Sequence, residues 1–236
     1  MLAYYYLGMQ VIPAMDLLGD EVVRLENGDY ERVIFRHPLD DFLSRVIATR
    51  PSMLHVVDLQ GARDGIPRLD LLGRCVRRAH PVPVQVSGGL RTVDDARTVL
   101  RAGASRVIIG SAAWEEPGLA AFVSALGAQL VVAVDVRDGV VATRGWRHGA
   151  LDLADALARC SDEGVARLHV TAIDRDGTRS GPDLALYERV VDSGIPVVAA
   201  GGVRDEDDLT ALEAIGCEAA VMGLGYLPRL GLTPGA

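Results

Sequence analysis

One pattern of residues occurs twice in this chain and limits what it can fold into. The pattern is an apolar run that ends in paired glycines, then an acidic helix start, then a second apolar run that ends in glycine. It spans residues 82–110 and occurs again at residues 197–223. Several matches in the same register are typical of an internal duplication. We therefore expect one domain, 1–236, built from two βαβαβαβα halves at about 9–118 and 119–236.

Apolar runs without strict alternation are separated by amphipathic stretches, as in buried parallel strands joined by helices. We expect strands near 11–16, 53–58, 84–87, 106–109, 130–135, 167–171, 197–200 and 219–222. We expect helices near 40–49, 68–79, 92–102, 118–126, 152–163, 183–192 and 205–215, with starts at Thr92 and Asp205. This order predicts an α/β fold, a closed (βα)8 TIM barrel, with a doubly wound open sheet as the alternative.

Composition excludes several classes of protein. The net charge of −8 disfavours a nucleic-acid partner, and no apolar run reaches the length of a membrane span. Cys75, Cys160 and Cys217 are far apart, which indicates reduced thiols and a cytoplasmic location. All 24 basic residues are arginine, so a cationic contact to a ligand must come from Arg, a backbone amide or a helix end.

The repeated glycines fall where a TIM barrel binds ligands, at the carboxyl ends of its strands. Glycine lets backbone amides approach an anion, and a following helix start favours negative charge. A tight turn would explain one isolated pair, but matching placements on opposed strands predict two phosphate sites. Their residues are Gly88, Gly89, Gly110 and Ser111 in one half, and Gly201, Gly202 and Gly223 in the other. Two opposed sites suit a small molecule with a phosphate at each end.

Several aspartates also fall at or just beyond strand ends, where they are candidates for a general acid and a general base. These are Asp16, Asp58, Asp135, Asp174 and Asp176. A solvated or helix-start role is the alternative for each of them. The histidines are scattered and no nucleotide-binding glycine loop occurs, so we expect proton transfer with no metal and no cofactor.

The stretches "VIPAMDLLGDEVVRLENGDY", "LHVVDLQGARDG", "VSGGLR", "VIIGSAAWEEP", "VATRGW" and "DRDGTRSGPDL" together resemble the ProFAR isomerase family of histidine biosynthesis. The resemblance runs from about Met9 to Gly223. It implies a (βα)8 barrel made of two half-barrels. It also implies an Amadori rearrangement of an aminoaldose to an aminoketose in a bisphosphorylated imidazole carboxamide ribotide.

The resemblance also assigns roles to individual residues. Asp16 matches the general base that removes the C2 proton, and Asp176 matches the acid that protonates the ring oxygen. Asp135 matches another essential carboxylate that competes for the role of proton donor. Substrate contacts are implied for Arg24, Ser87, Arg144, Trp146 and Thr171, and His55 is a substrate-binding candidate or a packed core group. Trp146 would stack on the heterocycle, with ordinary loop packing as the alternative.

The chain departs from the family pattern at three places. Gln60 stands where the family usually has Asp, and the residue after Gly223 is not basic. The chain ends in "YLPRLGLTPGA", whose prolines and glycines oppose a long helix. We therefore expect a shortened final helix and an outer groove, between the last and first barrel strands, that is bare or covered by residues 4–6.

Two other functions stay open. Some relatives also isomerise phosphoribosylanthranilate in tryptophan biosynthesis, and a barrel that binds phosphorylated metabolites without turnover is the other alternative. The sister cyclase is disfavoured because Arg24-Leu25 stands where that enzyme typically has lysine. We expect a monomer that acts on a small molecule.

Overall fold

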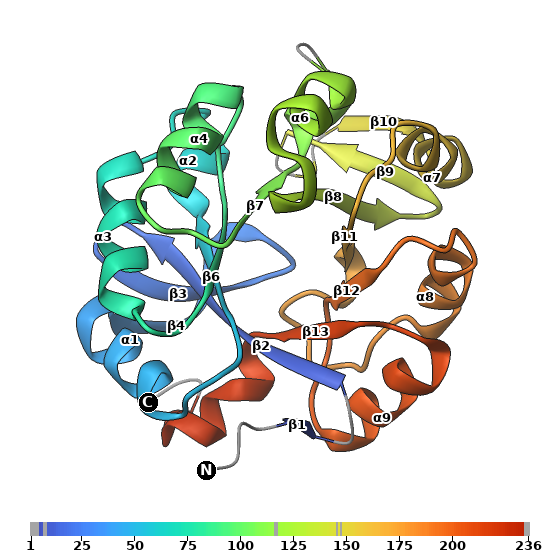
Figure 1. Cartoon of the computed structure of the whole chain (residues 1–236). Coiled ribbons are helices and arrows are strands. Elements are labelled where there is room, and N and C mark those ends of the chain that lie inside the picture. Colours follow the sequence, from blue (N-terminus) through green and yellow to red (C-terminus); the bar gives the residue numbers. More distant parts are fainter. Residues whose placement is uncertain (1–4, 7–8, 116–117, 145, 147, 234–236) are drawn as a thin grey trace.

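The computed structural model of the chain describes residues 5–6, 9–115, 118–144, 146 and 148–233. Eight of the described strands are parallel neighbours in a closed ring, which Figure 1 views along its axis. In ring order they are β2 (Met9–Leu18), β5 (Leu54–Asp58), β6 (Val84–Ser87), β7 (Arg106–Ile109), β8 (Leu130–Arg137), β11 (Leu168–Ala172), β12 (Val197–Ala200) and β13 (Ala219–Met222). Because β13 pairs with β2, the predicted TIM barrel is confirmed and the open sheet was the wrong alternative.

The barrel strands are buried on both faces, which explains their near-continuous apolar sequences. Along β2, Val11 joins the large core between strands and helices, whereas Ile12 and Ala14 join a smaller cluster inside the ring. The inward residues near the carboxyl ends are small, including Ala14, Ala133 and Ala200. These short side chains leave the space in which the cavity described below lies.

Helices surround the ring in Figure 1. They are α1 (Leu39–Ala48), α3 (Leu69–Ala79), α4 (Val93–Arg101), α6 (Leu119–Leu126), α7 (Leu153–Asp162), α8 (Leu184–Val191) and α9 (Glu206–Ile215). Thr92 accepts from the Asp95 amide and Asp205 from the Asp208 amide, so both predicted helix starts are confirmed. In the described ranges, no helix combines the length and apolar character required to cross a membrane.

Two antiparallel hairpins were not predicted from the sequence. The first consists of β3 (Glu21–Glu26) and β4 (Asp29–Pro38), and the second of β9 (Val140–Thr143) and β10 (His148–Asp152). Each follows a barrel strand that extends beyond the ring, since β2 pairs with β3 and β8 with β9. The remaining short elements are β1 (Tyr5–Tyr6), α2 (Leu59–Asp64), α5 (Ser111–Trp114), η1 (Gly127–Gln129) and η2 (Ile173–Arg175).

The described chain ends in a short 3-10 helix, η3 (Leu224–Leu230), rather than a long α-helix. Tyr226 meets the hydroxyl of Thr49 at 2.8 Å, and Leu230 accepts from Arg45 at 3.1 Å, so η3 packs beside α1. The expectation of a bare groove, or one covered by residues 4–6, was therefore wrong, because η3 itself covers it. Of residues 4–6, residue 4 lies outside the described ranges, and Tyr5–Tyr6 pairs with the start of β2.

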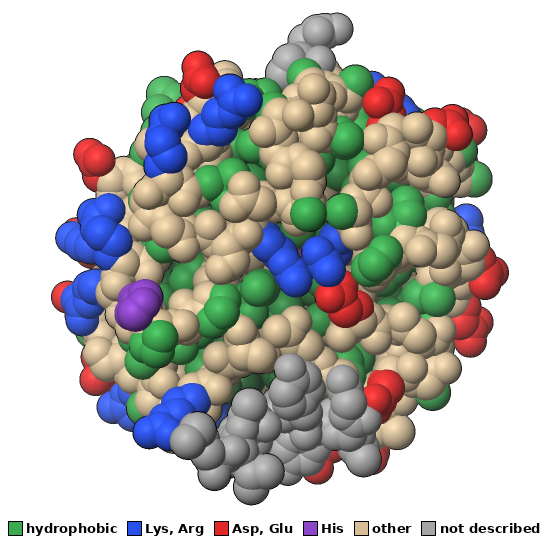
Figure 2. Space-filling model, in the orientation of Figure 1, with side chains coloured by type: hydrophobic (Ala, Val, Ile, Leu, Met, Phe, Trp, Pro, Cys, Tyr) green, Lys and Arg blue, Asp and Glu red, His purple; other side chains and the backbone are tan. Residues whose placement is uncertain are grey.

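The amino-terminal end of the barrel is closed by charged side chains. Arg167, just before β11, donates from Nε and Nη2 to the Glu218 carboxylate at 2.6 and 2.9 Å. Figure 2 shows basic and acidic side chains meeting near the centre of this face. The ligand site therefore has to be sought at the other end of the strands, as is usual for this fold.

Candidate active site

A cavity of about 300 Å³ lies at the carboxyl ends of the barrel strands. Every site residue named from the sequence lines it, apart from the acid or base candidates Asp58 and Asp174. Those that line it are Asp16, Arg24, His55, Ser87, Gly88, Gly89, Gly110, Ser111, Asp135, Arg144, Trp146, Thr171, Asp176, Gly201, Gly202 and Gly223. The structure therefore brings both halves of the duplication to one cavity, while the role of each residue stays a prediction.

Asp16 and Arg24 form an ion pair on the β2–β3 side of the cavity. Nη1 of Arg24 donates to Oδ2 of Asp16 at 2.8 Å, and Nη2 donates to the Ala14 carbonyl at 2.6 Å. The guanidinium also lies over the Phe42 ring, 5.7 Å from its centroid. Burial raises the pKa of Asp16, and the cation of Arg24 opposes that rise.

Asp135 lies on β8 and is held by two donors. Nε1 of Trp146 donates to its Oδ2 at 2.9 Å, and the Thr171 hydroxyl on the neighbouring strand also bonds to it. Burial raises the pKa of Asp135, whereas both hydrogen bonds favour the ionised form and limit the rise.

Asp176 follows η2 and enters the same cavity from a third direction. Burial and then the negative charge of Asp16 raise its pKa to about 7. Arg24 acts in the opposite direction, and Asp135 adds a smaller repulsion. The carboxyl groups thus have different environments, as an acid and a base working at one pH require.

His55 and His169 come from the repeated Leu-His-Val stretches on β5 and β11. Their rings stack with centroids 5.0 Å apart, and both side chains line the cavity. Burial lowers both pKa values, that of His169 to about 4, so both rings are neutral near pH 7. His55 also meets the Gln85 amide at 3.3 Å and therefore combines the predicted core role with access to the cavity.

Close backbone packing requires glycine in these pairs, whether or not a phosphate binds there. A Cβ on Gly88 would lie 2.3 Å from the Asp58 carbonyl oxygen, and one on Gly89 would lie 2.4 Å from that of Gly61. In the second half, a Cβ on Gly202 would lie 2.4 Å from the Gly181 carbonyl oxygen. All three glycines have positive φ, so both backbone conformation and close approach exclude side chains here.

The cavity is lined by more cations than the sequence analysis named. Arg144 pairs with Glu115 at 2.9 and 3.2 Å, and its amide donates to the Ser111 hydroxyl at 2.7 Å. Arg91 and Arg179, which the sequence analysis missed, also line the cavity. Arg91 could have been found from its place two residues after the glycine pair, since Leu90 alone separates it from Gly89.

Two of the strand-end aspartates have structural partners elsewhere. Asp58 is fully buried, and its carboxylate accepts from the Gly61 amide at 2.9 Å and from three donors of Arg68 at 2.7 to 2.8 Å. Asp174 is exposed and pairs with Arg137 at 2.9 Å. Their shared position at strand ends therefore does not make them members of the catalytic group.

A family model described as "Histidine biosynthesis protein" matches residues 10–227 of the chain. The chain belongs to the histidine biosynthesis protein family. The match covers all eight barrel strands, both hairpins and most of η3. The family expected from the sequence motifs is therefore confirmed.

Curated members of this family are similar over almost the whole chain. A protein of Rubrobacter xylanophilus is 45% identical over 224 residues, covering 90% of this chain and 89% of the relative. A protein of Synechococcus sp. strain WH7803 is 42% identical and covers 91% of this chain and 87% of the relative. A protein of Thermomicrobium roseum is also 42% identical, with 91% of each chain covered. Each is named 1-(5-phosphoribosyl)-5-((5-phosphoribosylamino)methylideneamino) imidazole-4-carboxamide isomerase.

Proposed function

We propose that this member of the histidine biosynthesis protein family is an isomerase that acts on the substrate named for its relatives and converts an aminoaldose to an aminoketose. That substrate carries a phosphoribosyl group at each end, which agrees with glycine-rich segments on opposite sides of the cavity. The observation that carries the proposal is the placement of Asp16 and Asp176 in one cavity with different electrostatic surroundings.

Asp176 is the general acid in this proposal. Its neutral form donates a proton to the ribose ring oxygen, the C1–O bond breaks, and the nitrogen lone pair forms an iminium at C1. Burial and then the negative charge of Asp16 disfavour ionisation of Asp176, so its pKa is raised to about 7 and the neutral form is available near that pH. Asp135, whose carboxylate accepts from Trp146 and Thr171, is better suited to holding Trp146 than to giving up a proton.

Asp16 is the general base. Its carboxylate removes the proton from C2, the electrons neutralise the iminium, and the resulting enolamine tautomerises to the aminoketose. Arg24 supports this role by favouring the ionised carboxylate. The isomerisation is redox-neutral, so side-chain proton transfer is sufficient and no cofactor is needed.

The remaining residues bind the substrate. One phosphate lies at Gly88, Gly89, Gly110 and Ser111, near Arg91, and the other lies at Gly201, Gly202 and Gly223. The Trp146 ring stacks on the imidazole, and Arg144, Ser87, His55 and Thr171 complete the wall. We place this chemistry in the cytoplasm, because the three cysteines are separate, buried free thiols.

The test is an assay of purified protein on the bisphosphorylated substrate and, separately, on phosphoribosylanthranilate. Asp16→Asn should reduce turnover of the first by about 10²-fold or more, with substrate binding retained. Asp174→Asn, which removes an exposed carboxylate beside the site, should leave turnover close to that of the parent. Equal turnover by Asp16→Asn and the parent would reject Asp16 as the base, and no turnover by the parent would reject the isomerase.

A further inference from the structure

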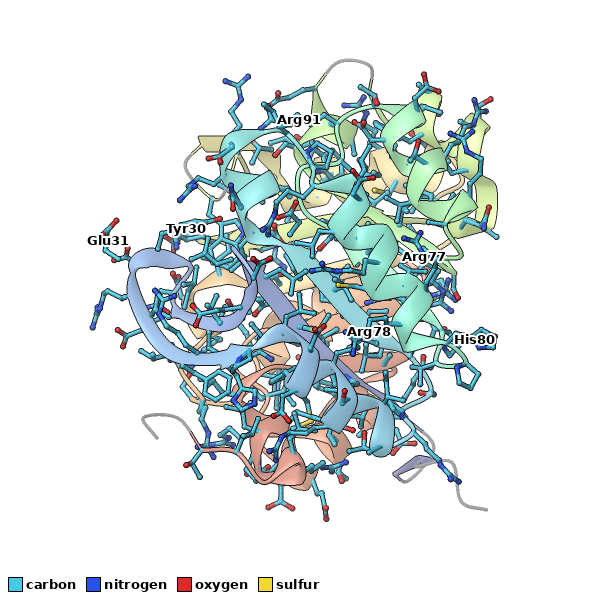
Figure 3. The ribbon with its side chains drawn as sticks, turned by 90° about the vertical axis from the view of Figure 1, so that its left-hand side faces the viewer. Tyr30, Glu31, Arg77, Arg78, His80 and Arg91 are labelled. Atoms are coloured by element: carbon cyan, nitrogen blue, oxygen red, sulfur yellow. The ribbon has the colours of Figure 1, made fainter. Side chains whose placement is uncertain are left out.

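The hairpin of β3 and β4 reaches the cavity through a two-residue turn, Asn27–Gly28. Both residues have positive φ, 51° and 71°, as a type I′ turn requires. In Figure 3 the hairpin, marked by Tyr30 and Glu31, lies at the opposite end of the barrel from His80. Turn geometry alone explains an Asn-Gly pair, so any further role needs contacts beyond the hairpin.

The first such contact is with the segment that carries Asp176. The amide of Asn27 donates to the carbonyl of Asp176 at 3.2 Å. A Cβ on Gly177 would lie 2.3 Å from the Leu25 carbonyl oxygen, so the two backbones are in direct contact. The turn therefore packs against the loop that carries Asp176, the proposed general acid.

The second contact is with Trp146, which lies between β9 and β10. A Cβ on Gly28 would lie 2.5 Å from Cζ3 and 2.8 Å from Cε3 of the indole. At its other edge the same ring donates from Nε1 to Asp135 at 2.9 Å. The indole is thus held between the turn and a site carboxylate, and it occupies the space that a side chain at position 28 would need.

We propose that Gly28 is a positioning residue for the isomerase reaction, because its missing side chain lets the Trp146 ring close over the cavity and keep its bond to Asp135. This inference rests on the proposed function for its catalytic consequence, but the contact itself is a property of the free protein. A side chain at position 28 moves the ring outward. The substrate then loses an aromatic surface, and Asp135 loses a donor.

The kinetic test is a double-mutant cycle. Asparagine tolerates positive φ, so Gly28→Asn adds a side chain with little backbone strain. We expect kcat/KM to fall by about 10- to 100-fold, the effect of misplacing a site group by about 1 Å. The matched control is Gly19→Asn, in the β2–β3 turn, where φ is 61° and nothing lies within 4 Å of an added Cβ. It should behave as the parent does.

In a Trp146→Ala background, Gly28→Asn should have almost no further effect, because the ring it displaces is gone. In the protein that keeps Trp146, Gly28→Asn should lower kcat and also raise KM. The amount of folded protein should be the same for Gly28→Asn as for Gly19→Asn. Independent, additive effects of the two substitutions, or equal effects of Gly28→Asn and Gly19→Asn, would overturn the proposal.

A second measurement needs no turnover. The chain has two tryptophans, so subtracting the emission of Trp146→Phe from that of the parent isolates Trp146. Gly28→Asn should increase acrylamide quenching of this component by about twofold or more as the ring leaves the cavity, and Gly19→Asn should not. Unchanged quenching in Gly28→Asn would overturn the positioning role. If the parent has no isomerase activity, the proposed function is rejected. The quenching result still decides whether Gly28 positions the Trp146 ring.

Discussion

Nη1 of Arg24 lies 2.8 Å from Oδ2 of Asp16, and the two side chains are 4% and 24% exposed. The cation comes from the β3–β4 hairpin and the carboxylate from a barrel strand, so the pair joins the two structures. Phe42 and the Ala14 carbonyl hold the guanidinium in place. The hairpin therefore supplies the charge that favours ionised Asp16 at a buried position.

Replacing Arg24 should change the pH dependence of the reaction. Arg24→Met removes the cation that opposes the rise in the pKa of Asp16, so this pKa should increase further. Since Asp16, as the proposed base, works in its ionised form, the acidic limb of the kcat/KM profile should move to higher pH. Arg36→Met, which breaks the exposed pair with Glu21 on the same hairpin, is the control. An acidic limb at the same pH in Arg24→Met and the parent would contradict this role.

The pKa of Asp176 predicts where the basic limb of the kcat/KM profile lies. As the proposed acid, Asp176 works in its protonated form, and its pKa is raised to about 7. As the pH rises through this value the neutral fraction falls, so kcat/KM should decrease about tenfold per pH unit well above it. A profile measured from pH 5 to 9 on folded protein checks this. A flat profile across pH 6 to 9 would exclude Asp176 as the acid.

Asp58 should matter for stability and not for chemistry. Its buried carboxylate holds the Gly61 amide and the Arg68 guanidinium, which in turn donates to the Leu17 and Gly19 carbonyls. Breaking a buried pair by removing one charge typically destabilises by about 3–5 kcal/mol, and Asp58→Asn should lose a free energy of unfolding in this range.

Urea unfolding of Asp58→Asn and the parent measures this loss. Asp64→Asn, which breaks an exposed pair with Arg63, should unfold close to the parent. Turnover per folded molecule should be retained in both variants. A loss of turnover without a loss of stability in Asp58→Asn would instead place Asp58 in the reaction.

The barrel could be predicted from the sequence because its elements are local patterns. Long buried apolar runs gave the strands, and side-chain caps such as Thr92 and Asp205 marked helix starts. The β3–β4 hairpin was missed although Asn27-Gly28 is itself a strong turn signal between alternating residues. Where one half of the barrel ends and the next begins, near residue 118, remains a prediction.

Other features depend on contacts between distant segments, which a pattern along the chain does not contain. Strand-end position did not distinguish Asp58, bonded to Arg68, from Asp16, which enters the cavity. The short η3 was expected from Pro228, but its burial against α1 depends on Tyr226 meeting Thr49. The contact of Trp146 with Gly28 likewise joins two loops that are far apart in sequence.

Gly110 allows the phosphate site to be tested apart from packing. The neighbouring pair is unsuitable, because a Cβ on Gly89 would meet a backbone carbonyl at 2.4 Å. At Gly110 the nearest atom to an added Cβ is the Ala133 Cβ at 3.6 Å, and φ is −98°. An added methyl group therefore meets no packing clash at this position, and urea unfolding of Gly110→Ala checks that the variant folds.

The methyl group of Gly110→Ala nevertheless enters the cavity where a phosphate would approach the backbone. A hydrogen bond to a charged group contributes about 1.5–3 kcal/mol, so KM should rise about tenfold or more, with a smaller change in kcat. Inhibition by inorganic phosphate should weaken in parallel. If KM and phosphate inhibition both match the parent, the anion does not bind at the end of β7, and the glycines of that half serve packing alone.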